Sequence, residues 1–239
     1  MAKLVLITGG AKRLGKSMAL YFADQGYDLL IHVNKSLVEG KSLITALEQT
    51  YPKQRFHLVC HDLTQWRSCE NVFERLFNEK GMPDVLIHNA SAYLKVNLEE
   101  VTDNQMEEMM AIHLYAPMII GRVFRKLGGK GQIISMLDSA ITKNVTSHGM
   151  YLVAKKALQN YTQMIALEWA PSIRVNAIAL GPVLPPEKEE ENYFHKVVEQ
   201  TPLESRVLES SLHASLAYLI QNENVTGQTL FCDSGQHLM

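Results

Sequence analysis

The sequence predicts an α/β fold in which one doubly wound, parallel sheet of seven strands carries helices on both faces. Short apolar runs recur seven times along the 239 residues, and helix-like stretches separate them. Strict alternation of strand and helix is typical of parallel sheets with right-handed crossovers. No linker, repeat or low-complexity segment divides the chain, so we expect a single domain over residues 1–239.

The expected strands are short apolar runs rich in β-branched residues. They lie at about 3–8, 28–33, 55–60, 84–88, 132–136, 173–179 and 228–232. Between them, apolar residues recur at helical spacing. This spacing predicts helices at about 14–26, 37–50, 65–80, 103–127, 149–169 and 208–221.

One segment, at about 184–206, interrupts this alternation. It opens with Leu184-Pro185-Pro186 and continues with acidic residues. A solvated loop is one interpretation of such a composition. Its position after a strand equally suits a mobile loop over a ligand site.

Composition excludes several classes of function. A net charge of −2 provides no basic surface for nucleic acid, and no apolar run reaches the roughly 18–20 residues of a membrane span. Met1-Ala2-Lys3 leads directly into the first strand, so we expect no signal peptide. Neither the three cysteines nor the pair His57 and His61 has the spacing or setting of a metal site. We therefore expect reduced thiols, no metal and a cytoplasmic protein.

The first strand runs directly into a glycine-containing turn. Leu4-Val5-Leu6-Ile7 is followed by Thr8-Gly9-Gly10-Ala11-Lys12-Arg13-Leu14-Gly15, where the first helix begins. In Rossmann-type folds such a turn lays a dinucleotide pyrophosphate on a helix N-terminus. The same turn also occurs as a purely structural connection. Whether this turn binds a dinucleotide must therefore be judged from the other motifs.

The end of the second strand distinguishes between nicotinamide cofactors. NAD-binding folds usually carry an acidic residue there, which holds the ribose hydroxyls. This strand ends in Asn34-Lys35-Ser36, without an acid. Lys35 and Arg13 would attract a 2′-phosphate that a carboxylate would repel. The sequence therefore favours NADPH, although a solvated surface lysine remains the alternative for Lys35.

A tyrosine and a lysine lie four residues apart on the helix expected at 149–169. Tyr151 and Lys155 occupy adjacent turns of one face. A nearby ammonium lowers the pKa of a phenol and makes it a better proton donor. The same pair also occurs by chance in many helices, as core packing beside a surface lysine.

Together these segments resemble the short-chain dehydrogenase/reductase family, from about residue 3 to the last strand. Further matches are Asp62-Leu63, His88-Asn89-Ala90 and Gly181-Pro182. The resemblance implies a Tyr151–Lys155 catalytic pair and an NADPH site. The implied cofactor-binding residues are Gly9, Arg13, Leu14, Asn34, Lys35, Ser36, Asp62, Leu63, Asn89, Ala90 and Gly181.

Three departures from the usual family pattern narrow the resemblance. Asp138 stands 13 residues before Tyr151, where most members have serine, while Arg13 and Ser91 replace glycines. These changes resemble the pteridine reductases, and more closely the bacterial dihydromonapterin reductases. That resemblance implies that Asp138 and Tyr151 relay a proton to a ring nitrogen. It also implies that Ser91 and Tyr93 contact a pterin.

The resulting prediction is an NADPH-dependent reductase of dihydromonapterin or dihydrobiopterin, with dihydrofolate as a possible further substrate, that assembles as a homotetramer. Two alternatives remain open: a carbonyl reductase acting on a 3-oxoacyl thioester, and a non-catalytic NADPH-binding regulator. Asp138 argues against the first, and the intact Asp138, Tyr151 and Lys155 argue against the second. His113 occupies the position of a family asparagine that organises a proton path, and we interpret it as a core residue with satisfied hydrogen bonds.

Overall fold

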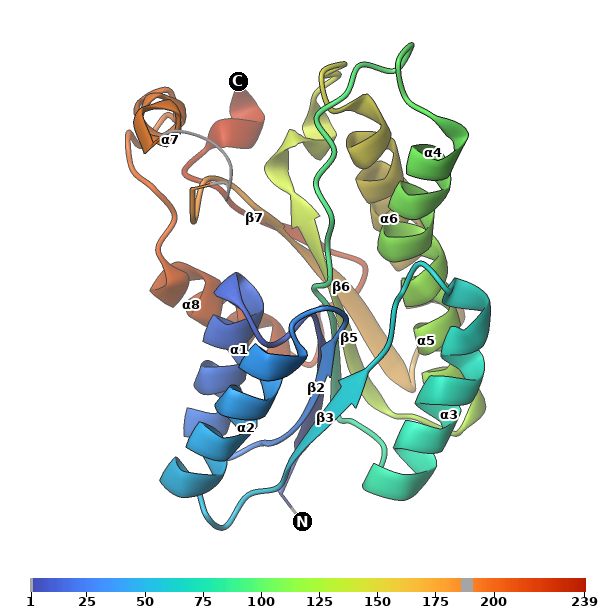
Figure 1. Cartoon of the computed structure of the whole chain (residues 1–239). Helices are drawn as coiled ribbons and strands as arrows, with labels where there is room; N and C mark the ends of the chain where they lie inside the picture. Colours follow the sequence, from blue (N-terminus) through green and yellow to red (C-terminus); the bar gives the residue numbers. More distant parts are fainter. Residues whose placement is uncertain (1, 186–190) are drawn as a thin grey trace.

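The sheet contains seven parallel strands in the order β3-β2-β1-β4-β5-β6-β7. The computed structural model describes residues 2–185 and 191–239. Helices cover both faces of the sheet (Figure 1). The predicted fold class is confirmed.

The strands follow the predicted apolar runs to within two residues at each end. They are β1 (Leu4–Thr8), β2 (Asp28–Val33), β3 (Phe56–Cys60), β4 (Val85–His88), β5 (Gly131–Asp138), β6 (Ile173–Leu180) and β7 (Thr229–Cys232). Strand β5 extends beyond the expected boundary, so Asp138 is its last residue. Parallel pairing places the carboxyl ends of all these strands at one edge of the sheet.

The helices also occupy most of the predicted stretches. They are α1 (Arg13–Asp24), α2 (Leu37–Thr50), α3 (Cys69–Lys80), α4 (Asp103–Met110), α5 (Ala116–Lys126), α6 (Gly149–Glu168), α7 (Glu191–Glu199) and α8 (Glu209–Gln221). Short 3₁₀ turns, η1 (Trp66–Ser68), η3 (Ser139–Thr142) and η4 (Gln236–Leu238), lie beside them. Among the described residues, no helix is both long and apolar enough to cross a membrane.

The single helix expected at 103–127 is wrong in one respect. A π-helical turn, η2 (Ala111–Tyr115), separates α4 from α5. Pro117 near the start of α5 lacks the N–H that would bond to the His113 carbonyl in a regular α-helix. The wider turn is the response of the backbone to this missing donor, and such turns are frequent at functional sites.

The segment expected as a loop at 184–206 also differs from the prediction. Residues Glu191–Glu199 form helix α7, and Phe194 on this helix is buried. The acidic composition did not predict this helix, because solvated helices and solvated loops are both rich in acidic residues. Residues 186–190 of the expected mobile loop lie outside the described residues.

Two apolar layers hold the helices to the sheet. Helices α1, α2 and α8 pack on one face, where Met18, Phe22 and Leu216 are fully buried. On the other face, α3, α5 and α6 pack through residues such as Phe73 and Phe124. The strands between these layers are buried on both faces, and their sequences are therefore continuous apolar runs.

Three buried histidines make the stability of the fold sensitive to acid. Burial lowers the pKa of His32 to about 4 and those of His88 and His113 to about 3. Their ordinary value in an unfolded chain is near 6.5. Below that pH the unfolded chain binds protons that the folded chain excludes, so acid favours unfolding.

We therefore predict that the free energy of unfolding falls by up to about 4 kcal/mol per pH unit as pH decreases from 6.5 toward 4.5. Urea denaturation at successive pH values measures this slope. His88→Gln should reduce it by about a third, whereas His195→Gln, at an exposed position on α7, should leave it unchanged. A free energy that stays constant between pH 6.5 and 5 would contradict the prediction.

Candidate active site

The glycine turn after β1 is bound directly to the segment after β4. The Thr8 hydroxyl accepts hydrogen bonds from the backbone N–H groups of Asn89 (2.9 Å) and Ala90 (3.0 Å), and it donates to the Ile87 carbonyl. The Asn89 side chain donates to the carbonyls of Thr8 and Gly9 at 2.9 and 3.1 Å. Asn89 therefore shapes the turn, and both predicted cofactor segments form one unit.

A buried histidine that the sequence reasoning missed supports the same turn. Gly9 has a φ of +65°, and a Cβ at this position would come within 3.0 Å of Ala90. The Gly9 N–H donates to His32 Nδ1 at 3.3 Å, and His32 Nε2 bonds to the His61 carbonyl at 3.0 Å. Apart from its place near the end of β2, His32 carries no signal in the sequence.

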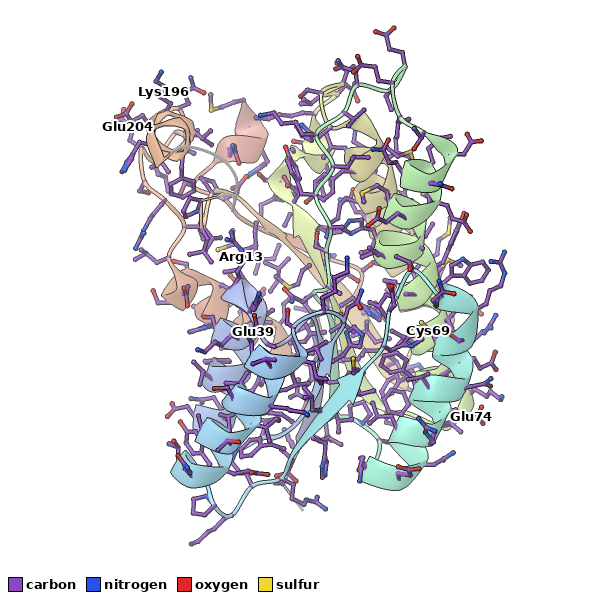
Figure 2. The ribbon with its side chains drawn as sticks, in the orientation of Figure 1. Arg13, Glu39, Cys69, Glu74, Lys196 and Glu204 are labelled. Atoms are coloured by element: carbon purple, nitrogen blue, oxygen red, sulfur yellow. The ribbon has the colours of Figure 1, made fainter. Side chains whose placement is uncertain are left out.

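Arg13 occupies a backbone conformation that usually requires glycine. Its φ is +49°, and it is the first residue of α1. The guanidinium donates to the Pro185 carbonyl at 2.8 Å. The side chain is exposed, and Figure 2 shows Arg13 at the N-terminal end of α1. Arg13 thus connects the glycine turn to the segment that precedes α7, a contact that spans 172 positions.

The end of β2 lies at the surface beside α2. Asn34 and Lys35 are exposed, and Ser36 is the N-cap residue of α2. Lys12 in the glycine turn forms a 2.7 Å ion pair with Glu39 in the first turn of α2. Lys35 lies just after the end of β2, as the sequence predicted.

The remaining predicted cofactor residues lie at the same edge of the sheet. Asp62 accepts hydrogen bonds from the backbone N–H and the hydroxyl of Thr64, and Leu63 is buried. Leu14, the second residue of α1, packs against the core. Gly181 follows β6, and a Cβ there would come within 2.6 Å of Asp233.

Asp138 and Tyr151 form a direct pair. The Tyr151 hydroxyl donates to Asp138 Oδ2 at 3.1 Å, while Asp138 Oδ1 accepts from the Ala140 N–H at 2.8 Å. One carboxylate therefore both caps the turn η3 and holds the phenol. The structure brings together the two residues that the family resemblance pairs.

The pKa of Tyr151 is raised overall, whereas the sequence led us to expect that a nearby Lys155 would lower it. Burial and the Asp138 carboxylate raise the pKa of Tyr151 well above its ordinary value, and a hydrogen bond with Ser91 opposes them only in part. Lys155 is itself buried, with its Nζ donating to the Met136 carbonyl at 2.8 Å. Burial lowers the pKa of Lys155 to about 8. The phenol is therefore protonated at neutral pH.

An aromatic cluster flanks the Tyr151 side chain. The Tyr93 ring lies edge-on to Tyr151 with centroids 5.2 Å apart, and 55% of Tyr93 is exposed. His148 lies 5.7 Å from Tyr93 and 6.2 Å from Tyr151. Sequence reasoning missed His148, although its place three residues before Tyr151 was a signal that it could be close.

His113 connects this cluster to the π-helical turn. It is 1% exposed, its Nε2 bonds to the Ala92 carbonyl at 2.8 Å, and its ring lies edge-on to Tyr151. Among the described residues its Nδ1 has no hydrogen-bond partner. We expected a core histidine with satisfied hydrogen bonds, and this is correct for Nε2 of His113 but not for Nδ1. Since Ala92 lies between Ser91 and Tyr93, His113 holds the segment predicted to contact substrate.

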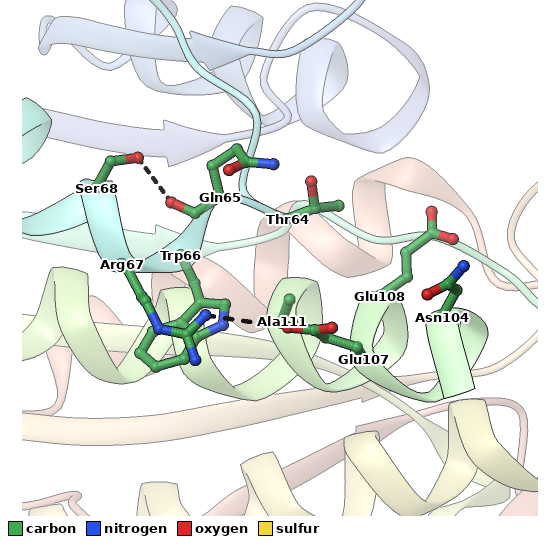
Figure 3. Close-up of a pocket in the computed structure, with 9 residues that line it drawn as sticks. All are labelled: Thr64, Gln65, Trp66, Arg67, Ser68, Asn104, Glu107, Glu108 and Ala111. Carbon is green, nitrogen blue, oxygen red and sulfur yellow. Dashed lines mark hydrogen bonds and ion pairs between the residues drawn. The ribbon is translucent and has the colours of Figure 1, made fainter. Parts of the chain in front are cut away.

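A separate hollow of about 450 Å³ lies beside η1 and α4. The Arg67 guanidinium lies 4.2 Å from the centre of the Trp66 ring and 4.0 Å from the Glu107 carboxylate. Figure 3 shows these three side chains together. Its lining contains none of the predicted site residues. Within the described part of the chain, no cluster of histidine, cysteine or acidic residues could hold a metal ion.

Comparison with known proteins identifies the family. The family model described as enoyl-(acyl carrier protein) reductase matches residues 9–237. The chain belongs to the short-chain dehydrogenase/reductase family. This membership covers the glycine turn, the Asp138–Tyr151 pair and the carboxyl-terminal strand.

Individual relatives narrow the comparison. Dihydromonapterin reductase from Shigella boydii serotype 4 (strain Sb227) is 25% identical over 239 residues, covering 98% of this chain and 96% of that protein. The namesake from Enterobacter sp. (strain 638) is 26% identical over 243 residues, with the same coverage.

Solved structures agree with this comparison. FolM alternative dihydrofolate reductase 1 from Brucella canis, complexed with NADP, has a TM-score of 0.93 and 30% identity, covering 99% of this chain and 94% of that one. The Brucella suis protein, also with NADP, has the same TM-score and identity and is covered to 96%.

The Thr8 hydroxyl provides a test of the connection between the two cofactor segments. Thr8→Val removes the acceptor for two partly buried N–H groups and should lower the free energy of unfolding by about 2–4 kcal/mol. Thr8→Ser keeps the acceptor and should lose only about 1 kcal/mol for the deleted methyl group. Urea denaturation of both variants measures the difference. Equal losses would show that the hydroxyl does not hold the segments together.

Proposed function

We propose that this protein is an NADPH-dependent reductase that converts dihydropterins to tetrahydropterins. The observation that carries the proposal is the 3.1 Å hydrogen bond between Tyr151 and the Asp138 carboxylate. Reduction of a C=N bond requires a proton on nitrogen, and a carboxyl–phenol pair can hold and transfer one. Relatives named dihydromonapterin reductase and alternative dihydrofolate reductase support this substrate class.

The glycine turn and its neighbours fit a phosphorylated dinucleotide. Gly9 brings the backbone close to Ala90, and the N-terminus of α1 favours an anion. No acidic residue follows β2 at Asn34–Ser36, so Lys35 and Arg13 would hold the 2′-phosphate. Asp62 and Leu63 would flank the adenine, and Asn34 would contact the cofactor beside Lys35. When bound, NADPH supplies the hydride.

The side chains of the site hold and orient the proton that the reaction needs. Burial and Asp138 raise the pKa of Tyr151, so the phenol retains its proton at neutral pH. The Ala140 N–H fixes the other oxygen of Asp138. Lys155, held by the Met136 carbonyl, places a positive charge behind the phenol ring, with its Nζ 5.8 Å from the ring centre.

Ser91 and Tyr93 provide the surface for the pterin. The exposed Tyr93 ring offers a flat apolar face beside Tyr151. Ser91 bonds to the phenol of Tyr151 and can also hydrogen-bond the edge of the substrate ring. Dihydromonapterin and dihydrobiopterin are the substrates in this proposal, with dihydrofolate as a further substrate.

We further propose a cytoplasmic homotetramer. Several apolar side chains are exposed on α5 and α6, among them Met118, Val153, Met164 and Leu167. A surface of this kind is typical of an interface between copies of a chain.

Cofactor preference depends on Lys35 in this proposal. Lys35→Asp should weaken NADPH binding by at least about 10-fold, because a charge-assisted phosphate contact contributes roughly 1.5–3 kcal/mol. NADH binding should stay the same or improve. Fluorescence titration with both cofactors measures the effect, and Lys41→Asp, on α2, is the control. Equal losses for NADPH and NADH would exclude Lys35 from the 2′-phosphate site.

Dihydropterin turnover depends on the carboxylate of Asp138. Asp138→Asn keeps the cap on Ala140 but cannot accept from the Tyr151 hydroxyl or pass on a proton. It should lower dihydropterin turnover by roughly 10²-fold, and Tyr151→Phe by roughly 10²–10⁴-fold, with NADPH binding intact. Stopped-flow NADPH oxidation with a dihydropterin and with an acetoacetyl thioester measures both activities. A fully active Asp138→Asn variant would make carbonyl reduction the better proposal.

A further inference from the structure

The proposed reaction needs a route by which protons return to the site. This inference rests on the proposed function, in which a hydride and a proton are added across a C=N bond. The Asp138–Tyr151 pair then loses one proton in each turnover, and solvent must replace it. The replacing group has to titrate near neutral pH and to lie between the pair and solvent.

Two titratable neighbours of Tyr151 are enclosed by the protein. His113 is 1% exposed, and burial keeps its pKa at about 3, so it stays neutral. Lys155 is 4% exposed, and its Nζ is bound to the Met136 carbonyl. A proton leaving either residue would have to be replaced through the protein interior.

His148 has a different environment. It is the N-cap residue of α6 and is partly exposed. Its ring lies against Tyr93 and Tyr151, with centroids 5.7 and 6.2 Å away. Its Nδ1 bonds to the Ser147 hydroxyl at 3.2 Å. Among the described residues that pack against Tyr151, His148 is the imidazole that also reaches solvent.

His148 interacts electrostatically with the Asp138–Tyr151 pair through the Asp138 carboxylate. Partial burial lowers the pKa of His148, Asp138 at the end of β5 raises it, and Lys95, two residues beyond Tyr93, lowers it. The net direction is below the ordinary value of 6.5. A lowered pKa means that the imidazolium, once formed, gives up its proton readily, and the Asp138 carboxylate links the charge on His148 to the pair.

We propose that His148 returns protons from solvent to the Asp138–Tyr151 pair. An N–H bond of the imidazolium breaks, and an O–H bond forms on Asp138 or Tyr151, with solvent water passing the proton between them. The neutral imidazole then takes a new proton from solvent. No electrons are exchanged, and one proton enters for each one delivered to the substrate.

Two substitutions separate proton return from ring packing. His148→Phe keeps an aromatic ring against Tyr93 and Tyr151, and His148→Gln keeps a polar side chain, but neither returns protons. Both should lower kcat for a dihydropterin by about 10-fold or more, with little change in the Kd for NADPH. Added imidazole buffer should restore kcat in proportion to its concentration. His57→Gln, on β3, is the control and should keep wild-type kcat.

A second measurement requires no turnover. In an NMR titration, the pKa of His148 should fall by at least about 0.3 unit in Asp138→Asn, because the attracting carboxylate charge is lost. The resonance of His148 is assigned by its absence in His148→Gln.

These measurements distinguish a failure of the proton-return role of His148 from a failure of the proposed reductase function. Normal kcat in His148→Phe, a loss that imidazole does not restore, or an unchanged pKa of His148 in Asp138→Asn would each overturn the proton-return role. Wild-type protein that binds NADPH but reduces no dihydropterin would instead overturn the proposed function.

Discussion

The parallel alignment of β1, β4 and β5 is the constraint on which the whole site depends. Ile7 pairs with Ile87, and Ile87 pairs with Ile134, so the three strands end at one edge. The segments that follow β1 and β4 therefore meet, and Thr8 binds the N–H groups after β4. Strand β5 continues to Asp138, which projects the carboxylate beyond its neighbours toward α6.

Burial decides how the residues at this edge ionise. The same enclosure that raises the pKa of Tyr151 lowers those of Lys155 and His113, because a low-dielectric interior disfavours every charged form. The interior of the site therefore holds its proton on the phenol. Exchange with water falls to partly exposed groups such as His148.

The sequence determined the fold class and predicted most of the residues that lie together at the candidate site. Alternation of apolar runs with helical periodicity set the order of the strands and helices, because each period matches one type of buried face. Local motifs also predicted which residues gather at the site. The glycine turn requires its strand and helix, and Tyr151 and Lys155 share a helix face, so both motifs are local in the chain. The pairing of Asp138 with Tyr151 was implied by the family resemblance, and the hydrogen bond between them is seen in the folded structure.

Tertiary structure alone decided the remaining features, since each depends on contacts between distant segments. Arg13 meets Pro185 across 172 positions, and His148 acquires its charge environment from Lys95 and Asp138. The sign of the Tyr151 pKa shift followed from burial, which no spacing between a tyrosine and a lysine reveals. Sequence patterns specify which faces are apolar, but the depth at which a polar group is buried is known only after packing.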